Sequence, residues 1–237
     1  MPSSRHITLK IFLSLIGLIV LMFVGQVVYY LWQFRYGDEE TLRTITQTYS
    51  DQFSKISDAD APNDYTNYTN LVKNHNPVTG KSDAPITVTA FIDFGCPYSQ
   101  ENYPVFSYIQ EQFNPAVRVV FKHLPLTQIH PDALPAALAA TCAQEQNKFW
   151  EYHNVLFQSR DLSQTALYND AQALGLNMAQ FDSCYTSQRY LTNIQQDIED
   201  AIDVGVRGTP TILINEEVVE GVSTQDDWNA RILSHLN

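Results

Sequence analysis

The sequence predicts an α/β domain that follows one N-terminal transmembrane helix. Three observations lead to this prediction: an uncharged apolar stretch near the start, a strand-helix-strand order in the middle, and a long helical stretch followed by two further short strands. At 237 residues, with 44% hydrophobic and 17% charged content, the chain is long enough for one membrane segment and one domain of roughly 150 residues with its own core.

The charge balance excludes one class of partner. The chain has 14 basic and 26 acidic residues, a formal net charge of -12. A surface that binds phosphates needs clustered Lys and Arg, and the sequence has no such cluster. We therefore expect no nucleic-acid partner.

The apolar stretch covers residues 11–34, IFLSLIGLIVLMFVGQVVYYLWQF, and carries no formal charge. At about 1.5 Å per residue, a helix of this length crosses a hydrocarbon layer of roughly 30 Å. A cleaved signal peptide is the alternative, but signal peptides have a shorter apolar core and a small-residue cleavage site, which this segment lacks. The segment therefore predicts a retained anchor in the cell membrane.

The flanking charges predict the orientation of that anchor. Arg5 and Lys10 precede it, whereas acidic residues at 38–40 follow soon after Arg35. The positive-inside rule then places residues 1–10 in the cytoplasm and everything after about residue 35 outside it.

Residues 35–76 predict a stalk helix and a linker. Apolar side chains recur at helical spacing in the first part, at Leu42, Ile45, Tyr49, Phe53 and Ile56. This helix either packs on the outer domain or pairs with a second copy, and it is too short to identify as a coiled coil. The following DADAPNDYTNYT has the composition of a linker, so the outer domain covers residues 77–237.

The outer domain begins with a strand-helix-strand unit. Residues 86–94 and 117–126 are β-branched and aromatic runs typical of buried strands, and residues 99–113 between them have the length and polarity of a helix. This order predicts two parallel strands.

Helices fill residues 131–205. Pro131 suits the first position of a helix, Asn177 with Gln180 resembles a capping box, and Gly175 and Gly205 each end a helix. Two strand-like segments follow, TPTILI and EVVEGV, which predict a hairpin, and then a short helix at 226–235.

Cys96 lies where the first strand ends and the next helix begins. There the sulfur faces unpaired backbone N–H groups and the positive end of the helix dipole, both of which favour the reactive thiolate. A buried, inert structural cysteine is the alternative. The position alone leaves both interpretations open.

Four segments in this order resemble the DsbA family of thiol-disulfide oxidoreductases over about residues 77–236: DFGCPYS, FKHLPL, HPDALPAALAATCAQEQNKFWEYHNVLF and GTPT. The resemblance implies a thioredoxin-like fold with a helical insertion at about 127–190. It also implies that Pro97 and Tyr98 shape the site. Pro210 is then a cis-proline facing Cys96, and Thr209 offers its backbone to an extended substrate.

The sequence departs from the family's CxxC pattern because Ser99 occupies the fourth position. A lone thiolate has no internal partner to break its mixed disulfide and must wait for an outside thiol. Isomerisation, or exchange with a small thiol or a partner protein, remains open to Cys96. We expect Ser99 to donate a hydrogen bond to the thiolate, to cap the helix, or to do both, and it is either natural or an engineered trap for intermediates.

The other two cysteines, Cys142 and Cys184, lie in the helical region. Similar positions in DsbA-like proteins suggest a structural disulfide, which in the chain-entropy model stabilises a loop of roughly 40 residues by about 3 to 4 kcal/mol. Two free buried thiols are the alternative. With the disulfide formed, Cys96 is the unpaired cysteine.

Further candidates near the site have an ordinary structural interpretation as well. Asp93 is either a proton shuttle for the thiol or a turn residue. His123 and His130 match no zinc-binding spacing, so we expect no metal and no cofactor, and His130 fits a helix start. Four aromatic residues at helical spacing either form core or line a peptide groove: Phe149, Trp150, Tyr152 and Phe157.

These observations predict a membrane-anchored, extracytoplasmic, monothiol enzyme that exchanges or isomerises protein disulfides through Cys96. Its partners are cysteine-containing exported proteins, together with a small thiol or a membrane redox partner, and a dimer through the stalk is an open possibility. The alternative is a non-catalytic peptide-binding chaperone or assembly factor. A third hypothesis is that Cys96 links two copies, or one partner, covalently.

Overall fold

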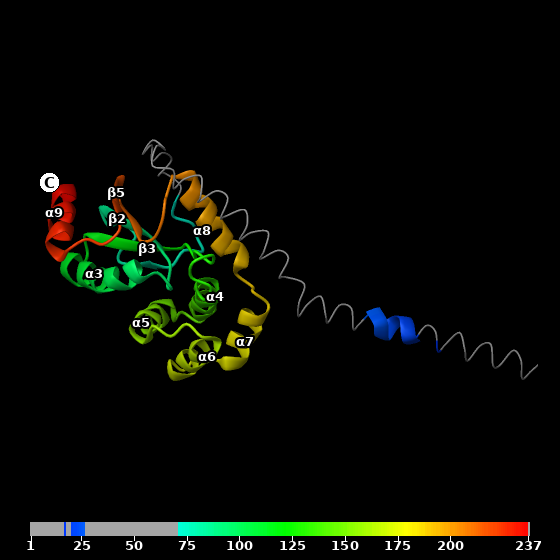
Figure 1. The fold of residues 1–237 in the computed structure, drawn as a ribbon. Coiled ribbons are helices and arrows are strands. Elements are labelled where there is room, and N and C mark those ends of the chain that lie inside the picture. The colour runs from blue at the N-terminus through cyan, green and yellow to red at the C-terminus, as the bar shows by residue number, and fades with distance from the viewer. Residues whose placement is uncertain (1–16, 18–19, 27–70, 237) are drawn as a thin grey trace, which may run out of the picture. The chain divides into compact units, whose positions relative to one another are not determined.

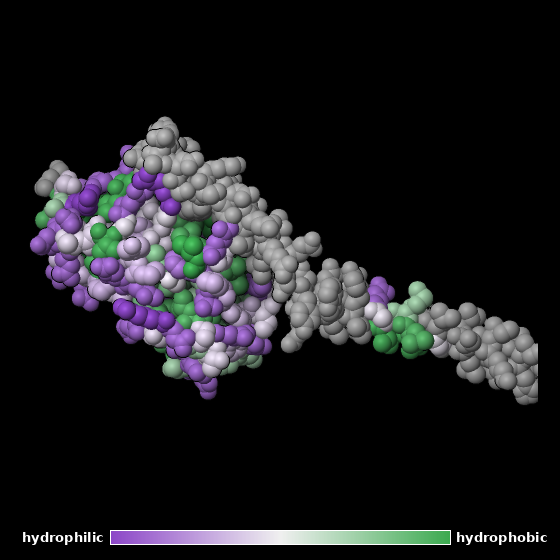
Figure 2. Space-filling view, viewed as in Figure 1, coloured by the Kyte–Doolittle hydropathy of each residue, from purple (hydrophilic) through white to green (hydrophobic). Residues whose placement is uncertain are grey.

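The computed structural model describes residues 17, 20–26 and 71–236 (Figure 1). Residues 17 and 20–26 are helical, and their apolar side chains, such as Leu21 and Phe23, are exposed, as the green surface of this segment in Figure 2 shows. Within the described residues, no helix has both the length and the apolarity needed to cross a membrane. The rest of the predicted anchor and the whole predicted stalk helix lie outside them.

The strands between residues 71 and 236 form one five-stranded sheet in the order β1-β3-β2-β4-β5. The strands are β1 (Val78–Thr79), β2 (Ile86–Ile92), β3 (Val117–His123), β4 (Thr211–Ile214) and β5 (Glu217–Glu220). The pair β2 and β3 is parallel and is connected by α3 (Pro97–Phe113), which confirms the predicted strand-helix-strand unit. The other pairs are antiparallel, and β4 with β5 is the predicted hairpin.

Alternating side chains of β2 contribute to two different parts of the core. Ile86, Val88, Ala90 and Ile92 belong to the cluster that includes apolar residues of α3 and of α9 (Gln225–Leu236), two helices that lie together in Figure 1. Phe91, which alternates with them, belongs to a second cluster with residues of α8. This alternation is the two-residue period of a strand whose two faces are both covered.

Helices occupy the chain between β3 and β4 (Figure 1). They are α4 (Ala133–Gln144), α5 (Phe149–Ser159), α6 (Gln164–Ala173), α7 (Met178–Thr186) and α8 (Leu191–Asp203). Of these, α4 to α7 fall within the predicted insertion, and α8 packs on β3.

The ends of these helices test the predicted start and stop signals. Gly175 and Gly205 have φ of 73° and 81° and lie just after the C-cap residues of α6 and α8, where they end these helices as predicted. Asn177 caps α7 by accepting from the Gln180 backbone N–H at 3.1 Å, but its own N–H donates to the side chain of Gln146 instead of Gln180. The prediction for Pro131 was wrong by two residues, because α4 begins at Ala133.

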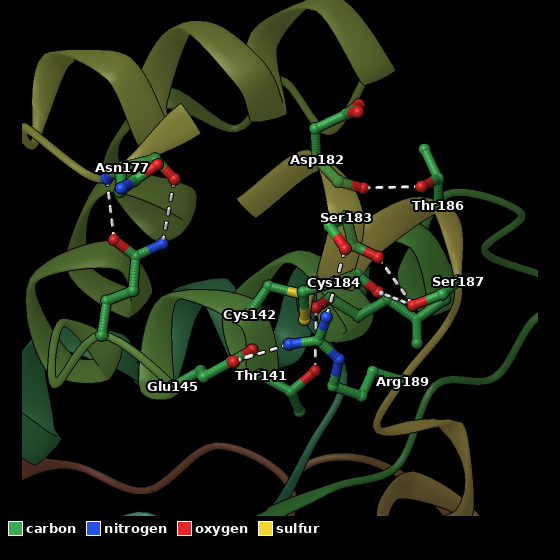
Figure 3. The surroundings of a disulfide bond; sticks show 12 residues. Thr141, Cys142, Glu145, Asn177, Asp182, Ser183, Cys184, Thr186, Ser187 and Arg189 are labelled. Atoms are coloured by element: carbon green, nitrogen blue, oxygen red, sulfur yellow. Dashed lines mark hydrogen bonds and ion pairs between the residues drawn. A yellow bond between two sulfur atoms is a disulfide. The ribbon is translucent and has the colours of Figure 1, made fainter. Parts of the chain in front are cut away.

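A disulfide joins Cys142 of α4 to Cys184 of α7 (Figure 3). Both cysteines are buried, and Arg189 spans the same two helices from outside by donating to Glu145 and to Ser183. The bond closes a loop with a sequence separation of 42 residues, which in the chain-entropy model stabilises the fold by about 4 kcal/mol.

A buried ionic network fastens the start of the described domain to the sheet and to α8. The Nζ atom of Lys122 on β3 lies 3.1 Å from Asp197 and 2.6 Å from Asp200, and none of these three residues is exposed by more than 6%. Asp197 also accepts from the side chain of Asn76 at 2.7 Å and lies 3.0 Å from Nε2 of His75. Segment 73–76 is therefore attached to the domain by hydrogen bonds and charge.

Candidate active site

Cys96 occupies the N-cap position of α3. Its backbone is extended, with φ of -77° and ψ of 123°, and Pro97 takes the first helical position, where no backbone N–H is needed. The Cys96 N–H donates to the Asp93 carbonyl at 3.2 Å, and its carbonyl accepts from Gln100 at 3.0 Å. A tight turn thus delivers the cysteine from the end of β2 to the positive end of the α3 dipole.

The sulfur of Cys96 meets a segment from the far end of the sequence. Its Sγ donates to the backbone carbonyl of Thr209 at 3.2 Å, and Thr209 precedes Pro210 in a cis peptide bond. Cys96 is 4% exposed. The structure therefore shows the juxtaposition that the resemblance implied, between residues that lie 113 positions apart.

An open groove of about 350 Å³ runs along this segment. It is lined by Arg207, Gly208, Thr209, Pro210, Thr211, Glu220 and Gly221. The N–H of Gly221 donates to the Pro210 carbonyl at 2.9 Å, and Asn102 of α3 donates to the Gly221 carbonyl at 3.1 Å. These two bonds hold the wall of the groove against the helix that presents Cys96.

Ser99 lies within the first turn of α3 and is fully buried. Its hydroxyl has no hydrogen-bond partner among the described residues, so neither expected role, a bond to Cys96 or a cap of the helix, is present. The hydroxyl of Thr209 is also buried and has no hydrogen-bond partner among the described residues. Tyr98, in contrast, is 62% exposed beside the cysteine.

Asp93 is a turn residue and a buried carboxylate at the same time. It is 1% exposed, and Oδ1 accepts from the Gly95 N–H at 2.7 Å while Oδ2 accepts from the Leu126 N–H at 2.8 Å. Burial raises the pKa of this carboxyl above its ordinary value, although its hydrogen bonds act in the opposite direction. The turn before Cys96 is thereby bonded to the loop that follows β3.

His130 belongs to this site, although the sequence suggested only a helix start. Its Nδ1 lies 2.8 Å from Oδ2 of Asp93. A Cβ atom placed on Gly95 would lie 2.9 Å from Cβ of His130, so the glycine is required by the close approach of the loop. The one sequence signal for this contact is that glycine directly before the cysteine.

The remaining candidates lie in the core. His123 and His153 are buried among aromatic rings, and burial lowers the pKa of each to about 4. Phe149, Tyr152 and Phe157 are buried as well, Trp150 is half-buried, and none of these lines the groove. Within the described part of the chain, no group of three His, Cys, Asp or Glu side chains is arranged to hold a metal ion.

The comparisons with known proteins agree with this geometry. A family model described as thioredoxin matches residues 73–233. Two curated relatives are Na(+)/H(+) antiporters, NhaA 3 of Salinispora tropica and NhaA 1 of Salinispora arenicola. The first is 35% identical over 158 residues and the second 36% over 139, covering 66% and 58% of this chain. The matches cover only 24% and 21% of those relatives, so the chain spans about a quarter of their length.

Solved structures match over nearly their whole length. BdbD from Bacillus subtilis has a TM-score of 0.63 at 23% identity, covering 68% of this chain and 93% of that one. The alpha-DsbA1 protein of Wolbachia pipientis has a TM-score of 0.61 at 21% identity, covering 69% and 92%. The chain belongs to the thioredoxin family and has the DsbA-like version of its fold.

Proposed function

We propose that the protein is a membrane-anchored, extracytoplasmic thiol-disulfide exchange enzyme that works through Cys96 alone. The observation that carries this proposal is the position of the Cys96 sulfur, at the N-terminus of α3 and 3.2 Å from the Thr209 carbonyl. The N-terminus of a helix favours negative charge, and the thiolate is the form of cysteine that attacks disulfides. The names of the similar structures, which include a thioredoxin-like oxidoreductase from Silicibacter pomeroyi, support the same reaction class.

The reaction follows from the presence of one thiol at the site. The Cys96 thiolate attacks one sulfur of a substrate disulfide, so that a new S–S bond forms, the old one breaks, and the other substrate sulfur leaves as a thiolate. A second thiolate, from the substrate or from a small thiol, then attacks the mixed disulfide and releases Cys96. When the substrate supplies this thiolate, its disulfides are isomerised without net oxidation.

The groove explains how a polypeptide substrate is held. Thr209 and Pro210 form part of its lining, and the Thr209 carbonyl lies 3.2 Å from the Cys96 sulfur. Main-chain hydrogen bonds recognise an extended segment without regard to its side chains. Cysteine-containing exported proteins are therefore the substrates we propose, and a small thiol or a membrane redox partner recycles the enzyme.

Two features support the location outside the cytoplasm. The uncharged stretch 11–34 has Arg5 and Lys10 before it, and Arg35 and then three acidic residues at 38–40 after it. The disulfide between Cys142 and Cys184 is typical of proteins in oxidising compartments.

The substitution Cys96→Ala separates this proposal from a non-catalytic peptide-binding chaperone. The matched control is Ser107→Ala, which removes a small polar side chain from the same helix. The variants are compared for exchange of a fluorescent peptide disulfide and for suppression of aggregation of a reduced, unfolded protein. We expect Cys96→Ala to abolish exchange. If the wild-type chain shows no exchange and Cys96→Ala still suppresses aggregation fully, the results favour the chaperone.

A further inference from the structure

The carboxylate of Asp93 joins three parts of the chain beside Cys96. It accepts from Gly95 in the turn that leads into α3, from Leu126 in the loop after β3, and it bonds to His130 just before α4. Its side chain is fully buried, whereas that of His130 is 17% exposed. Burying a carboxylate is costly unless hydrogen bonds compensate for the lost water, and His130 adds a side-chain bond to the two backbone bonds from Gly95 and Leu126.

The backbone fixes His130 in this place. Its N–H donates to the Leu126 carbonyl at 2.9 Å, and its carbonyl accepts from Ala133, the first residue of α4, at 3.0 Å. On the other side, the Cβ of His130 lies against the backbone of Gly95. The imidazole is therefore held between the start of α4 and the residue before the cysteine.

We propose that His130 is a positioning residue for Cys96. Through Asp93 it holds the turn 93–96 in the conformation that places Sγ opposite Thr209, and it thereby sets how often the sulfur is aligned with an incoming disulfide. The inference rests on the proposed exchange function and adds to it a residue that lies outside the CPYS motif. A displacement of about 1 Å in a reacting group can reduce a rate by orders of magnitude, so the effect is measurable.

The contacts predict what each substitution removes. His130→Ala removes the imidazole partner of Asp93 Oδ2, so the carboxylate loses its bond to the segment before α4 and the turn 93–96 is expected to be held less firmly. His130→Asn keeps a donor, because the amide nitrogen of Asn can occupy the place of Nδ1. Asp93→Asn places an amide where the side chain now accepts three bonds.

The measurement is the rate at which Cys96 of the full chain forms a mixed disulfide with a cysteine peptide activated as its thionitrobenzoate disulfide. Release of the coloured thiolate reports each reaction. The matched control is His235→Ala, because His235 also pairs with a carboxylate, Glu217, at 3.1 Å, yet belongs to α9 at the other end of the chain. Circular dichroism melting establishes that each variant is folded at the assay temperature.

We expect His130→Ala and Asp93→Asn to react about tenfold more slowly or worse. His130→Asn should remain within about threefold of wild type, and His235→Ala should match it. A rate for folded His130→Ala equal to that of wild type overturns the proposal, and so does a His130→Asn rate as low as that of His130→Ala. If His130→Ala does not fold, the rate of His130→Asn is compared with that of Asp93→Asn. Equal rates for these two variants overturn the proposal. A wild-type chain that forms no mixed disulfide would instead refute the exchange function itself.

Discussion

At the scale of single residues, Ser99 is the position that decides, under the proposed function, which kinds of exchange are open to Cys96. The side chain lies within the first turn of α3, fully buried, and its hydroxyl makes no hydrogen bond within the described residues. Replacing this hydroxyl with a thiol therefore breaks no hydrogen bond among the described residues. The same position in the family's CxxC pattern carries the resolving cysteine.

The substitution Ser99→Cys should therefore convert the site into a dithiol. We expect the variant to form an internal disulfide on treatment with an oxidised small thiol, whereas wild type stops at a mixed disulfide. Thiol counting and intact mass distinguish the two products. Ser107→Cys, on the same helix but more than two turns further from Cys96, is the control and should give no internal disulfide with it.

Two buried histidines make the stability of the fold depend on pH. His123 and His153 have pKa values lowered by burial from 6.5 to about 4, so the unfolded chain binds more protons than the folded one between these values. Stability is then complete above about pH 6.5 and falls as the pH decreases towards 4, by up to about 3 kcal/mol for each histidine. Both ring nitrogens of His123 lack a partner among the described residues.

Chemical denaturation of wild type and His123→Phe at pH 7 and pH 4.5 tests this prediction. The variant should lose part of the pH dependence, because one of the two histidines no longer takes up a proton on unfolding, while phenylalanine suits the surrounding aromatic rings. The idea fails if the two proteins lose the same free energy of unfolding over this range.

At the scale of elements, the network around Lys122 couples β3, α8 and the segment before β1. Removing the lysine leaves Asp197 and Asp200 buried without their shared cation, which typically costs about 3 to 5 kcal/mol. Lys122→Met is therefore expected to reduce the free energy of unfolding by this amount. Lys148→Met is the control, because the pair of Lys148 with Glu151 is exposed and should contribute less than about 1 kcal/mol. Urea denaturation of both variants measures the difference, and equal losses would contradict the prediction.

Most elements, but not their tertiary contacts, could be predicted from the sequence. The strands β2 and β3, the final hairpin and the ends of α6 and α8 follow from local patterns of β-branched residues and glycines. The bond between His130 and Asp93 has no local signal, because it depends on how a loop approaches a turn 37 residues away. For the same reason, no local pattern indicates that Lys122 pairs with two carboxylates of α8.

At the scale of the whole molecule, the predicted anchor is tested by fractionation of cells that express the full chain. We expect the protein to stay in the membrane pellet after alkaline carbonate extraction, and its outer domain to be digested by protease added to spheroplasts. The double variant Leu21→Asp, Val24→Asp is the control, because each central charge disfavours insertion by about 2.5 to 3.5 kcal/mol. A wild-type chain in the carbonate supernatant would contradict the anchor.

The central question for the proposed function is whether a single thiol at Cys96 turns over. The direct measurement is the number of peptide disulfides that each full-length chain exchanges in the presence of excess small thiol, followed until the reaction stops. The proposed function predicts many exchanges per chain, with Cys96 free again at the end. A reaction that stops at one equivalent, with the peptide still bound to Cys96, would contradict it and identify the site as a stoichiometric trap.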